Sequence, residues 1–386
     1  MSVKVYYTDT ENKEAYYNAP LLNQSFLKTL IPGKEYREDK KEETGEILPL
    51  QEILRSYREP KNLMLGDYLD TYLTSGNPKE VLNQKYYVEP IEKKPSESVM
   101  NIIKLYYTEI SGVDLSMKGP LISIARSLEY RNNYSDDKLY EMLVKEGLLY
   151  FQHLQKAEGK VILSQEDFDL ITEMLEKVDK SEYKIWLLET PWRFFGLESS
   201  SPELYYEVHF QKEIYFTIPD WFLPGMEEPL ECKALLDILI LEKSLETGEV
   251  VRAHVIDLKT TGTALFRFNE AVNKFRYDFQ LAFYSLAAAI EFNLDILKVS
   301  QGFLVISKVN RDLPMIYARM SAELLNRGLF GETTGNLNLI TDFRKTEHRF
   351  PYLGVTAALK NFQEEEKSNS NFLTRYLLTS SGFMSP

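Results

Sequence analysis

Two aspartates and a lysine occur in this sequence at a spacing that would bring their side chains together. Asp237 stands in one apolar run, and Asp257 and Lys259 end the next. A short polar stretch containing Gly248 separates the two runs, which is typical of a β-hairpin. A turn centred on Thr247 would place Asp237 opposite Asp257, with their Cβ atoms about 5 Å apart. Lys259 would share the face of Asp257.

Two carboxylates and an ammonium group on one patch of a buried sheet predict a site for a divalent cation. Buried charges are costly unless they are compensated, and carboxylate oxygens suit Mg²⁺ or Mn²⁺. The backbone carbonyl of Leu258 is a further candidate ligand. Such a metal polarises a phosphate and activates water, while Lys259 can stabilise developing charge. The alternative is a surface ion pair between Asp257 and Lys259.

The elements that must position these residues predict an α/β fold with a mixed sheet flanked by helices. Apolar residues at helical spacing dominate the first half, and from Glu203 the period changes to two. We expect strands at 203–218 and 297–309 and one long helix at 270–292. The expected regions are a mainly helical region (1–180), an α/β core (181–331) and a C-terminal extension with a loose tail (332–386). Further helices are expected near 23–30 (capped by Ser25), 63–76, 97–110, 120–130, 136–150, 166–178 and 319–331.

Composition excludes several classes of protein. The 386 residues are 44% hydrophobic, which is enough for a sizeable core. A net charge of −13 disfavours a simple basic DNA-coating protein, although a local basic groove remains compatible with it. The single cysteine, Cys232, excludes an internal disulfide and a cysteine-held metal cluster. No signal peptide or membrane span is expected, so we expect a cytoplasmic protein.

The stretch VIDLKTTGTALFRFNEAVNKFRYDFQLAFYS resembles the PD-(D/E)XK nuclease superfamily. Within it, the stretch is similar to the RecB-like branch and to the C-terminal nuclease of RecE, exonuclease VIII. The shared elements are an apolar strand leading into Asp-x-Lys-Thr-Thr and a following Gln-x-x-x-Tyr helix. The resemblance covers about residues 20–310 and is specific only at 234–290. It implies a restriction-endonuclease-like core and a deoxyribonuclease dependent on Mg²⁺ or Mn²⁺.

The resemblance assigns roles to five residues of this motif region. Asp237 corresponds to the first metal-binding aspartate, although the proline of the family name is missing before it. Asp257 corresponds to the second metal ligand and Lys259 to the catalytic lysine. Gln280 and Tyr284 correspond to the helix that positions the lysine, the DNA backbone or the attacking water.

Two acids earlier in the chain are further metal-ligand candidates by resemblance. Asp70 falls four residues after Gly66, where this branch usually has histidine, so metal preference or activity itself depends on the substitution. Aspartate can still bind Mg²⁺ or Mn²⁺. Glu207 lies on the strand before the hairpin, where the family places an acid; the alternative is an edge-strand acid. The four histidines, including His209 and His254, lack metal-ligand spacing.

Hydroxyl and basic residues after the motif are candidates for DNA binding. Basic side chains beside the site would contact phosphates and make binding salt-sensitive, or they are ordinary solvated charges. Phe266 and Phe268 would stack on an end base or pack beneath the helix. The candidate DNA-binding residues are Thr260, Thr261, Arg267, Lys274 and Arg276.

The function implied by the resemblance is an exonuclease that degrades linear double-stranded DNA, with 5′→3′ polarity as one expectation, in recombination or repair. Relatives of this kind are often phage-borne, act beside a single-strand annealing protein, and in some cases form homo-oligomeric rings. We therefore expect a DNA partner in a bacterial or phage-infected cell. Two alternatives stay open: a structure-selective endonuclease in repair or defence, and an inactive nuclease fold that binds DNA ends or a partner protein. The intact Asp237, Asp257, Lys259 and Gln280 set argues against the inactive alternative.

Overall fold

The computed structural model describes eleven stretches of the chain, which form two compact units. We call them the sheet unit (residues 1–70, 74–76 and 176–386) and the helical unit (residues 71–73 and 77–175). The sheet unit thus draws on residues from both halves of the chain. The tail expected at 379–386 lies outside the described residues, which are 3–8, 15–17, 19, 21–30, 61–91, 95–110, 114–226, 228–262, 264–309, 315–331 and 353–368.

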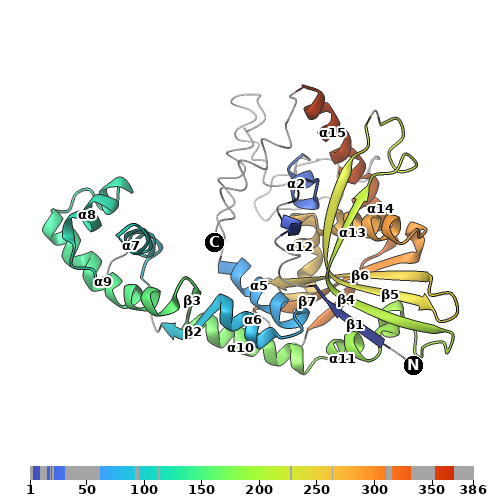
Figure 1. The fold of residues 1–386 in the computed structure, drawn as a ribbon, viewed down its shortest axis with the longest axis horizontal. Coiled ribbons are helices and arrows are strands. Elements are labelled where there is room, and N and C mark those ends of the chain that lie inside the picture. Colours follow the sequence, from blue (N-terminus) through green and yellow to red (C-terminus); the bar gives the residue numbers. More distant parts are fainter. Residues whose placement is uncertain are drawn as a thin grey trace. The chain divides into compact units, whose positions relative to one another are not determined.

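A curled mixed sheet of six strands forms the centre of the sheet unit (Figure 1). Its strands run in the order β1-β4-β5-β6-β7-β8. The β1–β4 and β6–β7 pairs are parallel, and the other neighbours are antiparallel. The sheet confirms the expected α/β class. The strands are β1 (Val3–Tyr7), β4 (Leu204–Thr217), β5 (Glu231–Ser244), β6 (Val250–Thr261), β7 (Val299–Ser307) and β8 (Ile316–Arg319).

The β5–β6 hairpin has the register predicted from the sequence. Ile238 pairs with Ile256 at the end of the ladder, and Asp237 and Asp257 are the next residues on the two strands. The turn contains Gly248 at φ +73°, a conformation that favours glycine. β6 then continues beyond the end of its pairing with β5 and stays paired with β7 as far as Thr261.

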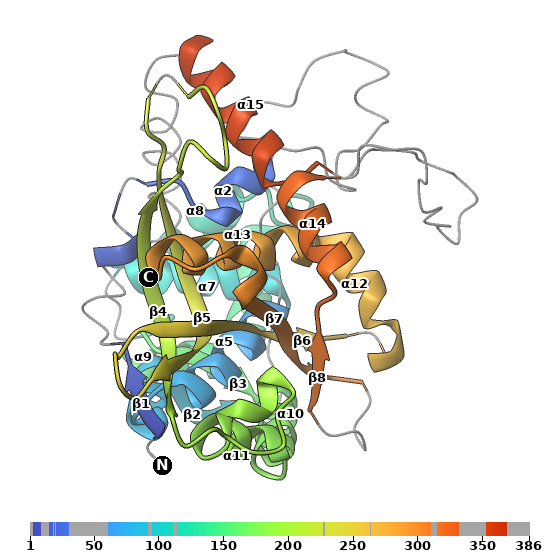
Figure 2. The ribbon, with the colours of Figure 1, turned by 90° about the vertical axis from the view of Figure 1, so that its right-hand side faces the viewer.

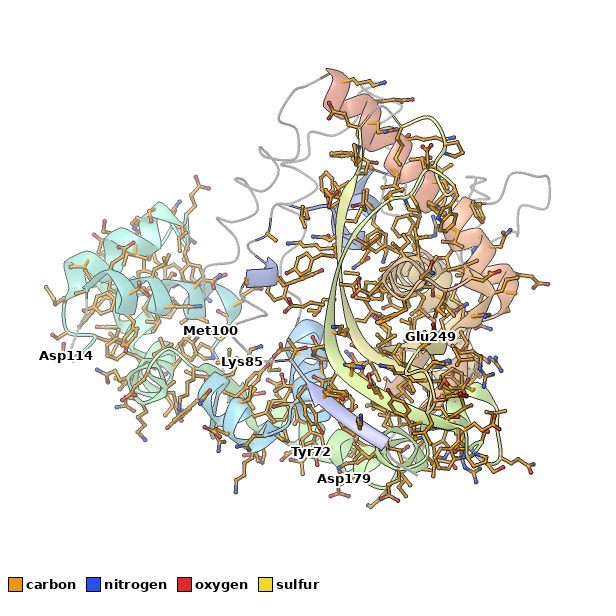
Figure 3. All side chains as sticks on the ribbon, turned by 45° about the vertical axis from the view of Figure 1, so that its right-hand side comes forward. Tyr72, Lys85, Met100, Asp114, Asp179 and Glu249 are labelled. Carbon is orange, nitrogen blue, oxygen red and sulfur yellow. The ribbon has the colours of Figure 1, made fainter. Side chains whose placement is uncertain are left out.

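Five helices accompany one face of this sheet. Helix α13 lies across β4, β5, β6 and β7, and α14 and α2 pack against it (Figures 1 and 2). Side chains fill the layer between α13 and its neighbours (Figure 3), and Phe279, Phe283 and Leu286 in this layer are fully buried. The helices are α2 (Gln24–Thr29), α12 (Phe268–Phe275), α13 (Tyr277–Glu291), α14 (Ala322–Phe330) and α15 (Val355–Ser368).

The single long helix expected at 270–292 is wrong, because the helix breaks at Arg276. This residue adopts φ +52°, which separates α12 from α13. Its guanidinium donates to Asp278 at 3.1 and 3.3 Å and to the Leu353 carbonyl at 2.7 Å. Arg327 donates to the same Asp278 at 2.8 Å. Asp278 is fully buried, so two arginines compensate its charge and hold the strained backbone in place.

The opposite face of the sheet carries an aromatic cluster. Helix α11 (Glu182–Leu188) and the 3-10 turn η1 (Pro191–Phe195) supply Phe194 and Phe195, whose rings lie 5.9 and 5.5 Å from that of His254 on β6. His254 is fully buried and contacts Ser300 and the Tyr317 hydroxyl, the latter at 2.7 Å. Burial lowers the pKa of His254 to about 3, so it is neutral near pH 7.

The helical unit has its own core. Helices α7 and α9 cross closely, because a Cβ on Gly147 would lie only 2.6 Å from Ile103. A parallel pair, β2 and β3, lies beside α9. Within the described residues, no helix is long and apolar enough to cross a membrane. The elements in or bordering this unit are α5 (Lys61–Thr74), α6 (Pro78–Lys85), β2 (Tyr86–Ile91), α7 (Glu97–Ile110), α8 (Lys118–Ser127), α9 (Asp136–Ala157), β3 (Val161–Ser164) and α10 (Gln165–Asp179).

The buried His254 predicts a loss of stability in mild acid. Its folded pKa of about 3 lies below the unfolded value near 6.5, so its stabilising contribution is complete above pH 6.5 and is lost as the pH falls towards 3. The stability advantage of the wild type over His254→Gln should therefore shrink by about 2 kcal/mol between pH 7 and pH 5. Urea unfolding of both proteins at each pH measures it. A pH-independent difference would contradict it.

Candidate functional site

A change of side-chain direction in β5 delivers Asp237 to the site. Ala234 and Leu236, before Asp237, point into the core beneath α13, and so do Leu239 and Leu241 after it. The inward-facing positions are therefore even-numbered before Asp237 and odd-numbered after it, so the alternation of side chains between the two faces of β5 shifts there. The neighbouring strand bends at the same place, where Gln211 adopts φ +52° between the pairs that join Phe210 to Ile238 and Lys212 to Leu236. The paired bend turns Asp237 towards the end of β6, where that strand no longer has β5 as its neighbour.

The carboxylate of Asp237 accepts a backbone hydrogen bond from the part of β6 that extends beyond its pairing with β5. Its Oδ2 accepts a hydrogen bond of 2.9 Å from the backbone N–H of Leu258. The N–H and C=O of one residue point to the same side of an extended strand. The Leu258 carbonyl is therefore directed to the same side as Asp237.

Helix α13 fixes the orientation of Asp257. Gln280 and Tyr284 are four residues apart and share one face of α13. Gln280 Nε2 donates to Asp257 Oδ1 at 2.8 Å and to the Tyr284 hydroxyl at 3.2 Å. Asp257 is 1% exposed. Burial, followed by the charges of Asp257 and Asp237, raises the pKa of Tyr284, so its hydroxyl stays neutral.

Lys259 is the cation of this cluster. Its Nζ forms an ion pair with Asp257 Oδ2, an atom that accepts no hydrogen bond of good geometry from the described residues. Burial lowers the pKa of Lys259, but the carboxylates of Asp257 and Asp237 outweigh that effect, and the net pKa is raised. Lys259 is therefore protonated at neutral pH and suits stabilisation of negative charge rather than proton abstraction.

The ionised form of Asp237 is destabilised by its surroundings. Burial raises its pKa well above the usual range, and the nearby carboxylates of Asp257 and Asp70 raise it further. Lys259 and the Leu258 N–H oppose this shift without cancelling it. The cluster thus carries more negative charge than its own cation compensates.

Asp70 reaches the cluster from α5 through Gln211. The Gln211 Nε2 atom lies 2.9 and 3.0 Å from the two carboxylate oxygens of Asp70 and 3.4 Å from Asp237 Oδ1. A Cβ added to Gly66 on the same helix would lie 3.8 Å from Thr260 Oγ1, so α5 passes close to the end of β6. The structure therefore brings Asp70 together with Asp237 by way of Gln211.

Glu207 lies away from this cluster. It pairs with Leu241, four residues along β5 from Asp237, which corresponds to roughly 13 Å of strand. Its carboxylate contacts Lys243 Nζ at 3.3 Å and His209 Nε2 at 3.2 Å. The expected metal-binding role of Glu207 is not supported. The side chain that β4 brings to the site is Gln211, which a search for acids overlooks.

The candidate DNA-binding residues divide into three groups. Lys274 is exposed, and Thr260 and Arg267 are partly exposed, with Arg267 in an ion pair with Glu270 at 2.7 Å. Thr261 is buried at the end of β6. Arg276 is only 8% exposed and is bound by Asp278, so its expected role in DNA binding is replaced by a structural one.

The two phenylalanines considered for base stacking differ in their exposure to solvent. Phe266 is 85% exposed, whereas Phe268 is buried. Only Phe266 is therefore open to a base, and Phe268 packs beneath the helix, as the alternative for this pair predicted.

Residues from the N-terminal segment that sequence reasoning missed also lie beside the cluster. Lys28 on α2 is close enough to Lys259 and Asp257 for their charges to affect its pKa. Tyr17 is close enough to Asp70 and Asp237 for the same effect on its own pKa. One residue of α13 that sequence reasoning also missed, Tyr277, lies beside the cluster too, with its ring centroid 4.8 Å from Lys259 Nζ. No sequence signal indicated the N-terminal contacts, because more than 200 residues separate that segment from Lys259.

The donor set fits a hard divalent cation in part. Among the described residues, no three His, Cys, Asp or Glu side chains are grouped closely enough to hold a metal ion as they stand. Gln211 Nε2 lies between Asp70 and Asp237, which accounts for their separation. Rotation of that amide would present its oxygen instead of its nitrogen. The repulsion that Asp237 experiences from Asp257 and Asp70 favours an added cation.

Comparisons with known proteins give a distant structural likeness. No family model matches the chain, and no curated protein matches it. Among solved structures, the chain is similar to a crystal structure described as a "putative exonuclease" from Eubacterium rectale, with 13% identical residues. The match covers 83% of this chain and 80% of that chain, with a TM-score of 0.34.

The excess negative charge predicts a trade-off between stability and metal binding. Without a divalent metal at neutral pH, Asp237→Asn should raise the free energy of unfolding by about 1 kcal/mol or more, because it removes a poorly compensated buried charge. Added Mn²⁺ or Mg²⁺ should stabilise the wild type by mass action and the variant much less. Urea unfolding in EDTA and across a metal titration measures both effects.

Glu207→Gln is the matched control for that experiment, because it also removes a carboxylate from a neighbouring strand. Its response to metal should equal that of the wild type. If neither Mn²⁺ nor Mg²⁺ stabilised the wild type more than Asp237→Asn, Asp237 would not be a metal ligand.

Proposed function

We propose that this protein is a deoxyribonuclease that hydrolyses phosphodiester bonds with the help of Mg²⁺ or Mn²⁺. The observation that carries the proposal is the Gln280–Asp257–Lys259 arrangement beside Asp237. A buried carboxylate is held by an amide at 2.8 Å and paired with a protonated lysine, and a second carboxylate adjoins them. Carboxylates with a lysine at the end of a strand are suited to charge stabilisation in phosphoryl chemistry.

In this proposal, Asp237, Asp257 and the Leu258 carbonyl would hold the metal, with Asp70 beside them. When bound, the metal supplies Lewis-acid polarisation of the phosphate and a lowered pKa for water. The protein's own groups perform the positioning. The Leu258 N–H fixes Asp237, and Gln280 fixes Asp257.

Lys259 stabilises the negative charge that develops on the phosphate oxygens. Its raised pKa keeps the ammonium protonated throughout the neutral range. The Tyr277 ring beside Nζ limits where the ammonium can move and adds a favourable cation–π contact. Gln280 links Tyr284 to Asp257, so the buried end of the site keeps one arrangement during the reaction.

For the substrate, we propose linear double-stranded DNA degraded from an end, as the resemblance to RecE-type exonucleases implies. The exposed Phe266 follows β6 directly and is available to stack on a terminal base. The exposed Lys274 is available to phosphates.

A catalytically inactive, DNA-binding protein is the second candidate. It is favoured by the Gln211 amide, which binds Asp70 where a metal-binding role was expected.

Nuclease activity should depend on Lys259. Lys259→Ala should lower the cleavage rate by about 100-fold or more, because it removes a charge that acts on the transition state. End-labelled linear duplex and closed circular DNA, each with Mg²⁺, Mn²⁺ or EDTA, provide the measurement. Loss of linear DNA alone supports an exonuclease, and nicking of circles supports an endonuclease.

Lys243→Ala is the matched control, because Lys243 is also a lysine of the sheet paired with an acid, in its case Glu207 on the neighbouring strand β4. It should retain wild-type cleavage. DNA binding without cleavage in either metal would favour the inactive candidate, and equal loss of activity in both variants would remove Lys259 from the mechanism.

A further inference from the structure

Helix α2 is held firmly against the sheet by a buried lysine and an added backbone pair. Lys233 Nζ donates to the carbonyls of Tyr16, Tyr17 and Ala19 at 2.6, 3.2 and 2.6 Å. Leu22 forms a parallel bridge with Cys232 on β5. Side chains on α2 therefore have defined positions relative to the sheet.

The start of α2 is fixed by its own cap. The side chain of Asn23 accepts a hydrogen bond of 3.0 Å from the Phe26 N–H, so Asn23 is the cap rather than the expected Ser25. The cap lies one residue after the bridge at Leu22, so the helix begins directly where the backbone leaves the sheet. Little freedom is left for the helix to rotate.

Lys28 on this helix lies next to the candidate site. Its Nζ donates to the Phe275 carbonyl at 3.1 Å and lies 5.9 Å from the centroid of the Tyr277 ring. Lys259 Nζ lies 4.8 Å from the same centroid. Two ammonium groups, from distant parts of the sequence, are thus within 6 Å of one aromatic ring.

These two ammonium groups are unequally compensated. Lys259 is paired with Asp257, whereas Lys28 donates to a neutral carbonyl. Burial of the half-buried Lys28 lowers its pKa to about 7; repulsion from Lys259 adds to the shift, and the charges of Asp257 and Asp278 oppose it without cancelling it. An anion placed beside both groups would relieve that repulsion and favour the charged form of Lys28.

We propose that Lys28 is a second phosphate-binding residue, which holds the nucleic-acid backbone next to Lys259. The proposal rests on the nuclease function and adds a residue to its substrate site. A phosphodiester group carries one negative charge and offers oxygen acceptors to both ammonium groups. Lys28 positions the strand, whereas Lys259 acts on the phosphate that reacts.

The competing interpretation is that Lys28 only caps the end of α12, where Phe275 is the last residue of the helix. A capping role predicts that replacing Lys28 lowers stability and leaves the salt dependence of DNA binding unchanged. A phosphate-binding role predicts a weaker salt dependence, because the slope of log K against log salt decreases by about one unit for every phosphate that is no longer neutralised.

The test measures binding without cleavage. The full-length wild type, Lys28→Gln, Lys28→Met and Lys28→Arg are titrated onto a fluorescent linear duplex in EDTA, at several salt concentrations. Lys28→Gln and Lys28→Met should each reduce the slope by about 0.9, and Lys28→Arg should keep it near the wild-type value. Urea unfolding checks that each variant is folded.

Lys298→Gln is the matched control, because Lys298 is an exposed lysine in the turn that precedes β7, at the other end of the strand from the site. Its slope should equal that of the wild type. An unchanged slope in Lys28→Gln, or an equal decrease in Lys298→Gln, overturns the phosphate-binding role while leaving the nuclease proposal intact. A wild type that neither binds nor cleaves linear duplex overturns both proposals.

Discussion

Repulsion among buried carboxylates is the constraint on which the sheet unit depends. Asp237 and Asp257, from the two strands of a hairpin, are close enough for their charges to repel, and Asp70 adds a third charge beside Gln211. A folded chain keeps such a group only when donors and cations are fixed around it. The Leu258 N–H, the Gln280 amide and the Lys259 ammonium perform that task here, two from the end of β6 and one from α13.

Two backbone distortions make this arrangement possible. The bend at Gln211 accompanies the shift in the alternation of β5, so Asp237 points to the end of β6. The left-handed conformation of Arg276 ends α12 and starts α13 at the angle that places Gln280 over Asp257. Both distortions are held by side-chain contacts, Gln211 by Asp70 and Arg276 by Asp278. Strain of this kind persists only where the surroundings determine it, and both of these residues adjoin the site.

The sequence was informative wherever the interacting residues are close in the chain. The hairpin register followed from one glycine-containing turn, and the shared face of Gln280 and Tyr284 followed from helical spacing. Prediction failed where the deciding contact is distant. The loop between β4 and β5 is too long to fix a register, and the resemblance pointed to an acid on β4, so Glu207 was expected and Gln211 was missed. Nothing local marks Arg276 as a helix break, because its conformation depends on Asp278 and on the Leu353 carbonyl.

The contacts of the site also differ greatly in the number of residues that separate the two contacting residues in the sequence. Asp237 and the Leu258 N–H are 21 residues apart, and Asp257 and Gln280 are 23 apart. Asp70 and Gln211 are separated by 141 residues, and Lys28 and Phe275 by 247. Closing a longer loop costs more entropy and slows folding. The contacts within the hairpin and between β6 and α13 therefore close short loops, whereas Asp70 and Lys28 are synthesised 141 and 247 residues before the partners that hold them in place.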